Sequence, residues 1–72
     1  MVLGQRGWII AINHQKQLGT IRGEDGRFHH FFRDDMVRWL EFDELNSGDL
    51  VLYDLETTGS AVNVERTPFR PA

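Results

Sequence analysis

Residues 16–32 read KQLGTIRGEDGRFHHFF, and this stretch decides the fold. Residues 18–22 and 27–32 have the composition of short strands, and the Asp-Gly sequence within residues 23–26 is typical of a tight hairpin turn between them. The second strand holds five rings in succession, FHHFF at positions 28–32, where alternation normally places polar residues between apolar ones. The stretch therefore predicts a β-hairpin with aromatic rings on both of its faces.

Strand alternation divides these five rings between two faces. With a period of two residues, Phe28, His30 and Phe32 point to one side of the strand. His29 and Phe31 then point to the other side. A shift of one residue would exchange the two faces completely, so the spacing alone leaves both registers open.

The rest of the chain supplies three more strands. Residues 5–13, 50–55 and 61–65 are short runs rich in β-branched and aromatic residues, separated by polar and Gly-containing turns. Residues 33–47 show neither strand alternation nor a helical stripe, and they predict a long connection with a helical turn near residues 34–40. Five short strands with this spacing predict an all-β, five-stranded antiparallel OB-fold barrel, and an SH3-like barrel is the alternative.

Length and composition bound the domain organisation. The 72 residues allow one domain, which we place at residues 1–66, followed by an irregular tail at residues 67–72 that contains both prolines. The chain has no cysteine, so disulfides and thiolate metal sites are excluded. No segment approaches the ~20 apolar residues of a membrane span or has the form of a signal peptide, and we expect a cytoplasmic protein without a membrane association.

The net charge of −3 is unevenly distributed along the chain. Five cations and two carboxylates give residues 1–33 a charge of +3, whereas eight carboxylates and one arginine give residues 34–56 a charge of −7. This asymmetry is compatible with one basic face on an acidic body, and equally with solvated charges that are scattered unevenly. The cations that flank the aromatic strands are Lys16, Arg22, Arg27 and Arg33.

The polar residues do not form a recognisable metal or catalytic pattern. Zinc needs about four ligands in a tetrahedral array. His29 and His30 are neighbours on one strand and therefore point in opposite directions, and His14 alone adds too little. The adjacent carboxylates at residues 34–35 and 43–44 lack a nucleophile or an acid/base spacing. We expect no metal, no other cofactor and no enzymatic activity.

Three motifs near the start of the chain are GWIIAIN at residues 7–13, KQLGTI at 16–21 and RFHHF at 27–31. They resemble the opening Gly-x-(Val/Ile)-Lys-Trp-Phe-Asn and the two ribonucleoprotein motifs, Lys-Gly-Phe-Gly-Phe-Ile and Val-Phe-Val-His-Phe, of the bacterial cold-shock domain. FDELNSGDLVLY at 42–53 is similar to the family's Phe-x-x-Leu-x-x-Gly-x-x-Val-x-Phe, and AVNV at 61–64 to its closing Ala-x-Asn-Val. The resemblance spans most of the chain.

The resemblance implies an OB-fold that binds single-stranded RNA or DNA through its second and third strands. On this match Phe28 and His30 stack outward, so we favour the register that keeps His29 inside with a backbone partner. Phe42 falls at the place of a loop phenylalanine that contacts one more base, and Trp39 extends the same surface. Cations beside the rings suit a phosphodiester backbone. The expected nucleic-acid-binding residues are Lys16, Leu18, Thr20, Arg22, Arg27, Phe28, His30, Phe31 and Phe42.

The chain departs from the family on the expected binding face. Ala11, Leu18 and Thr20 stand where the family has a Trp and two Phe residues that stack on bases. Each stacked base contributes about 1–3 kcal/mol, so we expect weak binding with little sequence preference. The alternative is a protein-interaction or regulatory domain that has lost nucleic-acid binding, with Ile10, Ala11 and Leu18 as a patch for a protein partner. Trp8 is interpreted as strand packing or a dimer contact.

Overall fold

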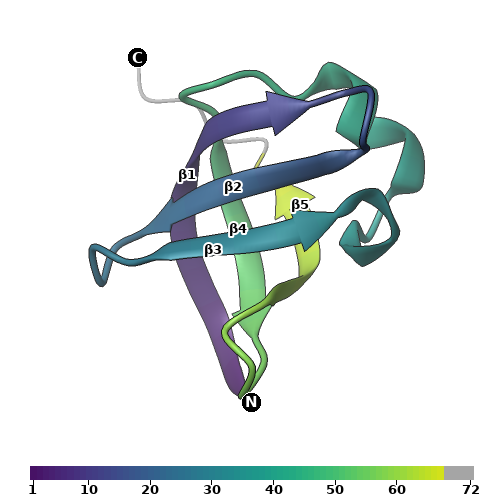
Figure 1. Cartoon of the computed structure of the whole chain (residues 1–72). Coiled ribbons are helices and arrows are strands. Elements are labelled where there is room, and N and C mark those ends of the chain that lie inside the picture. The colour runs from purple at the N-terminus through teal and green to yellow at the C-terminus, as the bar shows by residue number, and fades with distance from the viewer. Residues whose placement is uncertain (68–72) are drawn as a thin grey trace.

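The computed structural model describes residues 1–67. The strands are β1 (Val2–Asn13), β2 (Leu18–Gly23), β3 (Phe28–Phe32), β4 (Leu50–Leu55) and β5 (Ala61–Arg66), and two short 3-10 helices, η1 (Arg33–Asp35) and η2 (Trp39–Glu44), lie between β3 and β4. All five strands belong to one antiparallel sheet in the order β3-β2-β1-β4-β5. The sheet curls strongly into a half-barrel (Figure 1). The all-β expectation is confirmed; the tail expected beyond Thr67 lies outside the described residues.

The first strand is longer than the sequence indicates. It starts at residue 2 instead of residue 5, because its first half pairs with β4, from Val2 opposite Leu55 to Trp8 opposite Leu50. Its second half pairs with β2, from Gly7 opposite Gly23 onward. One long bent strand therefore belongs to both halves of the curled sheet. The helical turn expected near residues 34–40 takes the form of η1 and η2.

A bulge in β1 turns two consecutive side chains outward. The β1–β2 register shifts between Ile9 and Ala11. Ile9 is buried and Ile12 packs against the core, whereas Ile10 and Ala11 between them are both exposed. A bulge adds one residue to a strand and bends it, so it serves here to curl the sheet and to bring the two apolar residues to its convex side.

The core fills the concave side of the sheet. Phe31 from β3 and Phe42 from η2 are fully buried and meet edge to face, with ring centroids 6.1 Å apart. The buried apolar residues are Ile9, Ile21, Phe31, Met36, Phe42, Leu45, Val51, Tyr53, Ala61 and Val64. The link between β3 and β4 supplies three of them and covers the end of the half-barrel where β3 ends (Figure 1). Each large apolar side chain buried at this end stabilises the fold by roughly 1.5–3 kcal/mol.

The link is also tied to the last strand. Met36 forms a parallel bridge to Val64, and the N–H of Val37 donates to the Val64 carbonyl at 2.8 Å. Strands β3 and β5 are the two edges of the sheet. The link therefore fills the space between these edges instead of forming a free surface loop.

The register of β3 is the one that keeps His29 inside. Phe28, His30 and Phe32 are exposed, whereas His29 and Phe31 are buried. The Nδ1 atom of His29 shares a hydrogen bond with the Gly59 carbonyl at 3.2 Å, which is the backbone partner that a buried imidazole requires. The unshifted register is confirmed.

Asp25 and Tyr53 are polar neighbours of the His29 ring. The Nε2 atom of His29 lies 3.4 Å from Asp25 Oδ2, close enough for an ion pair but without a formed hydrogen bond. The backbone N–H of Arg27 donates to Asp25 and holds the pKa of that carboxyl below its usual value, and the nearby His29 acts in the same direction. Burial raises the pKa of Tyr53, whose ring lies 5.8 Å from that of His29.

Within residues 1–67, no helix is long and apolar enough to cross a membrane. The same residues contain no cluster of three or more His, Asp or Glu side chains arranged to hold a metal ion.

Candidate nucleic-acid interface

The pairing of β1, β2 and β3 aligns their outward side chains in rows across the convex side of the sheet. Side chains of directly opposite residues lie on the same face and contact each other. The convex side of these strands is called the β1–β3 face below. Its three rows are Trp8–Arg22–Phe28, Ala11–Thr20–His30 and Asn13–Leu18–Phe32.

Aromatic rings dominate this face. Phe28 and Phe32 are about three-fifths exposed, at 62% and 61%, and Trp8 is 43% exposed. His30 lies between the two phenylalanines and is also exposed. Residues two apart on a strand are separated by roughly 6.6–6.8 Å, so β3 offers three rings at a regular spacing to solvent. Large apolar rings that are gathered in this way without a cover mark a binding surface.

The centre of the face is a polar contact between two strands. Thr20 Oγ1 and His30 Nδ1 lie 3.0 Å apart and share a hydrogen bond. The contact fixes the imidazole plane, and His30 Nε2 makes no hydrogen bond to any residue from 1 to 67. The middle ring can therefore both stack on a base and exchange a hydrogen bond with it.

The cations that are not paired with carboxylates lie on this face or in the turns at its two ends. Seven Lys and Arg residues lie within the described chain, and four of them form ion pairs: Arg6 with Glu24, Arg33 with Asp43, Arg38 with Glu41, and Arg66 with Glu44 and Asp49. The remaining three, in this part of the chain, form none. They are Lys16 in the turn before β2, Arg22 in the first row, and Arg27 just before β3.

Two of the expected contact residues are in the core instead. Phe31 is 1% exposed and Phe42 is 0% exposed, so neither ring can stack on a base in this fold. Phe31 points inward because β3 alternates strictly, and Phe42 points inward because η2 caps the open end of the half-barrel. The assignment of both residues to the binding surface is corrected accordingly.

The other expected residues lie on or beside the face. Leu18 and Thr20 are half-buried, each opposite a ring of β3, and Arg22 is exposed in the same line along β2. Lys16 and Arg27 occupy the turns at the two ends of the hairpin. The structure therefore brings together seven of the nine predicted residues.

Arg33 and Trp39 form a separate structural unit beyond the end of β3. The Arg33 guanidinium stacks on the Trp39 ring at 3.6 Å, donates from Nε to the Trp39 carbonyl, and pairs with Asp43 at 2.8 Å. Arg33 is buried, so it does not flank the rings as a free cation. Trp39 keeps half of its surface exposed, but its indole N–H donates to Asp34 and its ring is used by Arg33.

The expected binding residues include neither Trp8 nor Phe32, although both lie on this face. Both rings follow from strand alternation. Trp8 is next to the buried Ile9 and therefore points outward, opposite Arg22. Phe32 points outward two residues after His30. Trp8 therefore places an indole in the first row of the face, and Ala11 lies in the second.

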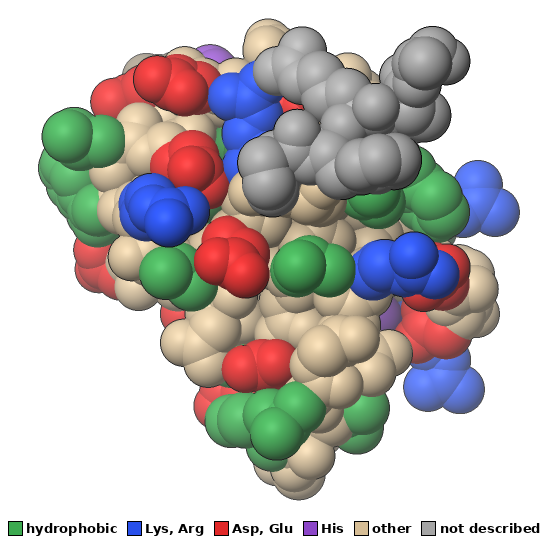
Figure 2. Space-filling view, turned by 180° about the vertical axis from the view of Figure 1, so that it is seen from behind, with side chains coloured by type: hydrophobic (Ala, Val, Ile, Leu, Met, Phe, Trp, Pro, Cys, Tyr) green, Lys and Arg blue, Asp and Glu red, His purple; other side chains and the backbone are tan. Residues whose placement is uncertain are grey.

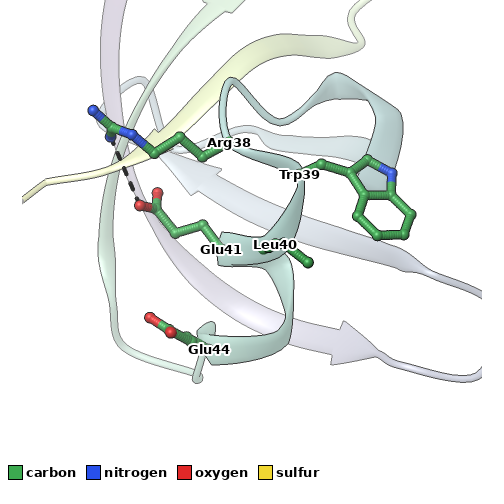
Figure 3. A pocket seen from close by; sticks show the side chains of 5 residues that line it. All are labelled: Arg38, Trp39, Leu40, Glu41 and Glu44. Carbon is green, nitrogen blue, oxygen red and sulfur yellow. Dashed lines mark ion pairs between the residues drawn. The ribbon is translucent and has the colours of Figure 1, made fainter.

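Shallow hollows on the described surface lie at the first row of the face, along β3 and at η2. One is at the first row of the face, lined by Trp8, Arg22, Gly23, Glu24 and Gly26. A second follows the outer side of β3 and the β4–β5 turn, lined by Arg27, Phe28, His29, His30 and residues 55–60. The third is at η2, where the Arg38–Glu41 ion pair and Glu44 lie on one side and Trp39 points away from them (Figure 3).

The opposite side of the molecule has a different character. Figure 2 shows it with acidic and basic side chains interspersed and apolar side chains in separate small groups. Two ion pairs at this end of the sheet join Arg66 of β5 to Glu44 and Asp49.

Comparison of the chain with protein-family models finds no match, and comparison with curated proteins finds none either.

Proposed function

We propose that the chain is a cold-shock-like OB-fold domain that binds single-stranded RNA or DNA on its β1–β3 face, weakly and with modest sequence preference. The single observation that carries the proposal is the coincidence of exposed rings with the three unpaired cations. Single-strand binders combine these two elements, a cationic path for the phosphates and flat rings for the bases.

The ring arrangement supports an extended strand as the ligand. Phe28, His30 and Phe32 are spaced along β3 as successive unstacked bases are spaced along an extended backbone, and Trp8 adds a platform on the far side of Arg22. A duplex would hide its base faces from such rings. The curled five-stranded sheet is compatible with an OB-like barrel, which suits this mode of binding.

A titration with oligo(dT) and oligo(U) at low salt tests the proposal. We expect saturable changes in tryptophan fluorescence and in the amide shifts of residues 16–33. The pair Phe28→Ala and His30→Ala should abolish binding without unfolding the domain. Leu40→Ala is the matched control, because Leu40 is 71% exposed but lies on η2, away from the face. Unchanged binding by the double variant would overturn the site.

Salt dependence supplies a second measure. Each phosphate that a cation neutralises contributes about −0.7 to the slope of log K against log salt for a single strand. Arg22→Gln should make this slope shallower by about 0.7. Arg38→Gln, which removes an exposed cation already paired with Glu41, should leave the slope unchanged.

A second candidate function is docking of a protein partner on the same face. It is favoured by the bulge residues Ile10, 41% exposed, and Ala11, which border Thr20 and Leu18 as an apolar strip. If no amide shifts at about millimolar oligonucleotide, nucleic-acid binding is excluded and docking of a protein partner stands in its place.

A further inference from the structure

The hollow at the first row of the β1–β3 face combines three kinds of side chain. It is lined by Trp8, Arg22, Gly23, Glu24 and Gly26. Trp8 and Arg22 are direct cross-strand partners, and Glu24 follows Arg22 by two residues and lies next to it on the same side of the sheet. The two glycines have no side chains to fill the space. A flat ring, a cationic fork and a carboxylate thus surround one small open volume.

Arg22 has unused hydrogen-bonding capacity. Its side chain forms no ion pair, no hydrogen bond and no stacking contact with residues 1–67, although Trp8 and Phe28 flank it. By contrast, the buried Arg33 uses its guanidinium for a stack, a carbonyl and a carboxylate. An arginine carries five N–H donors in a planar fork, which suits a pair of acceptors on one edge of a ligand.

Glu24 is held in place and still has acceptor capacity. Arg6 donates to it from Nε and Nη2, to the two carboxylate oxygens, each at 3.1 Å. This bidentate pair orients the carboxylate and partly neutralises it. A carboxylate has about four lone-pair sites, so each oxygen retains one for a ligand. The side chain is 50% exposed, and the free sites are within reach of the hollow.

We propose that this hollow is a seat for a guanine base. Guanine presents two acceptors, O6 and N7, on one edge, which match the fork of Arg22. The adjacent edge presents two donors, N1–H and the N2 amino group, and a free lone pair of Glu24 can accept one of them. Trp8 supplies the platform on which the ring stacks. Adenine has an amino donor where guanine has O6 and has no N2 amino group, so it opposes Arg22 and leaves Glu24 without a partner.

For a guanine within a strand, this inference rests on the proposed function, in which Phe28 and His30 hold the neighbouring bases. It adds a base preference at one position to a face that otherwise stacks on any base. Since a bidentate contact discriminates by about 1–3 kcal/mol, the preference for guanine over adenine should be roughly 5-fold to 100-fold.

The test uses thymidine heptamers that carry guanine, adenine, hypoxanthine or 7-deazaguanine at the central position. A Trp39→Phe background leaves Trp8 as the indole that reports binding. We expect the guanine heptamer to bind about 5-fold to 100-fold more tightly than the adenine heptamer. Hypoxanthine, which lacks the amino group, tests the contact to Glu24, and 7-deazaguanine, which lacks N7, tests the contact to Arg22. Both should fall between guanine and adenine.

Two variants separate the effect of the planar guanidinium of Arg22 from the effect of its positive charge. Arg22→Lys keeps the positive charge but loses the planar pair of donors, so it should retain affinity for oligo(dT) within about threefold while its guanine preference becomes smaller. Arg38→Lys is the matched control and should change neither quantity. A guanine preference of unchanged size in Arg22→Lys would overturn the assignment of Arg22.

The outcomes distinguish the seat from the general function. Equal affinity for all four heptamers would overturn the guanine seat and leave single-strand binding intact. Binding of free GMP with Trp8 quenching, without binding of any heptamer, would support the seat and overturn the strand as its source. Absence of binding to GMP and to every heptamer would overturn both.

Discussion

Single ring-to-Ala substitutions along β3 should lower either the free energy of unfolding or the affinity for oligonucleotides, depending on which side of the sheet the ring faces. Phe31 is 1% exposed and packs edge to face on Phe42, so Phe31→Ala removes a buried ring from the centre of the core. Such a truncation costs about 3–5 kcal/mol. Phe28→Ala and Phe32→Ala remove rings that are about three-fifths exposed, and their effect on the free energy of unfolding should stay within about 0.5 kcal/mol.

Urea denaturation followed by circular dichroism measures this contrast. With an m-value of roughly 1 kcal/mol per molar urea for a small domain, Phe31→Ala should lower the midpoint by roughly 3–5 M. That loss is comparable with the whole stability of a small domain, so Phe31→Leu provides a milder step of about 1 kcal/mol. Oligonucleotide affinity should show the reverse order and fall about 5-fold to 100-fold for Phe28→Ala.

A wild-type midpoint for Phe31→Ala, combined with a lowered midpoint for Phe28→Ala, would refute the register of β3 and the face built on it. Equal losses for both variants would mean that the sheet does not separate an inner from an outer side at this strand.

Three further predictions concern stability. Gly19→Ala should lower the free energy of unfolding by about 1–3 kcal/mol in urea titrations, because a Cβ there would lie 2.6 Å from the Phe31 ring; a neutral effect would contradict this packing. Arg33→Lys keeps the charge but loses the planar stack and the fork, and thermal and urea unfolding should show a loss of about 1–3 kcal/mol, whereas wild-type stability would refute this role. Folding lowers the pKa of Asp25, mainly through the Arg27 N–H, so its ionised form stabilises the fold above the usual pKa of 3.8, and that contribution is lost as the pH falls through the lowered pKa. Asp25→Asn should therefore be less stable than the wild type near pH 6, with a difference that shrinks in acid; a constant difference would exclude the carboxylate as its cause.

The hairpin was predictable from the sequence, and so was the division of the β3 rings between two sides, because both depend on local rules. Which of the two sides faces the core was not, and Phe31 was therefore placed wrongly on the binding surface. The Asp-Gly turn fixes where the chain reverses, and period-two alternation then assigns Phe28 and Phe31 to opposite sides. The buried His29 needed a backbone partner, and Gly59 provides it across the β4–β5 turn. Such a partner could be expected from the chemistry of the ring, but its identity depends on how the sheet curls.

The position of Phe42 was not predictable, because it depends on a gap between distant strands. The link from β3 to β4 has no period in its sequence that reveals a direction for each side chain. Its direction is set by the opening between β3 and β5, which needs apolar residues to cover it, and by the bridge from Met36 to Val64. Similarly, the early start of β1 depends on β4, its partner some fifty residues later in the chain.

The acidic block at residues 34–56 also has a structural role that its composition conceals. Seven of its eight carboxylates accept hydrogen bonds or ion pairs within the domain. Asp35 accepts from the N–H of Phe32 at 2.8 Å, and Asp54 accepts from the N–H of Gly4, which together with Asn63 holds the pKa of Asp54 below its usual value. These carboxylates hold the link and the strand ends in place through hydrogen bonds and ion pairs within the domain.

Net charge is therefore a poor guide to what this chain binds. Charges on exposed groups are screened over about 8 Å at physiological ionic strength, and the domain measures 31 × 27 × 19 Å. A ligand on the β1–β3 face is closest to Lys16, Arg22 and Arg27, none of which forms an ion pair with residues 1–67. The other described cations are paired with carboxylates, so the three unpaired cations of residues 1–67 lie on or beside this face although the whole chain carries −3. At physiological salt a ligand on this face interacts mainly with the charged groups within about 8 Å of it, so the net charge of −3 does not by itself exclude a polyanionic ligand there.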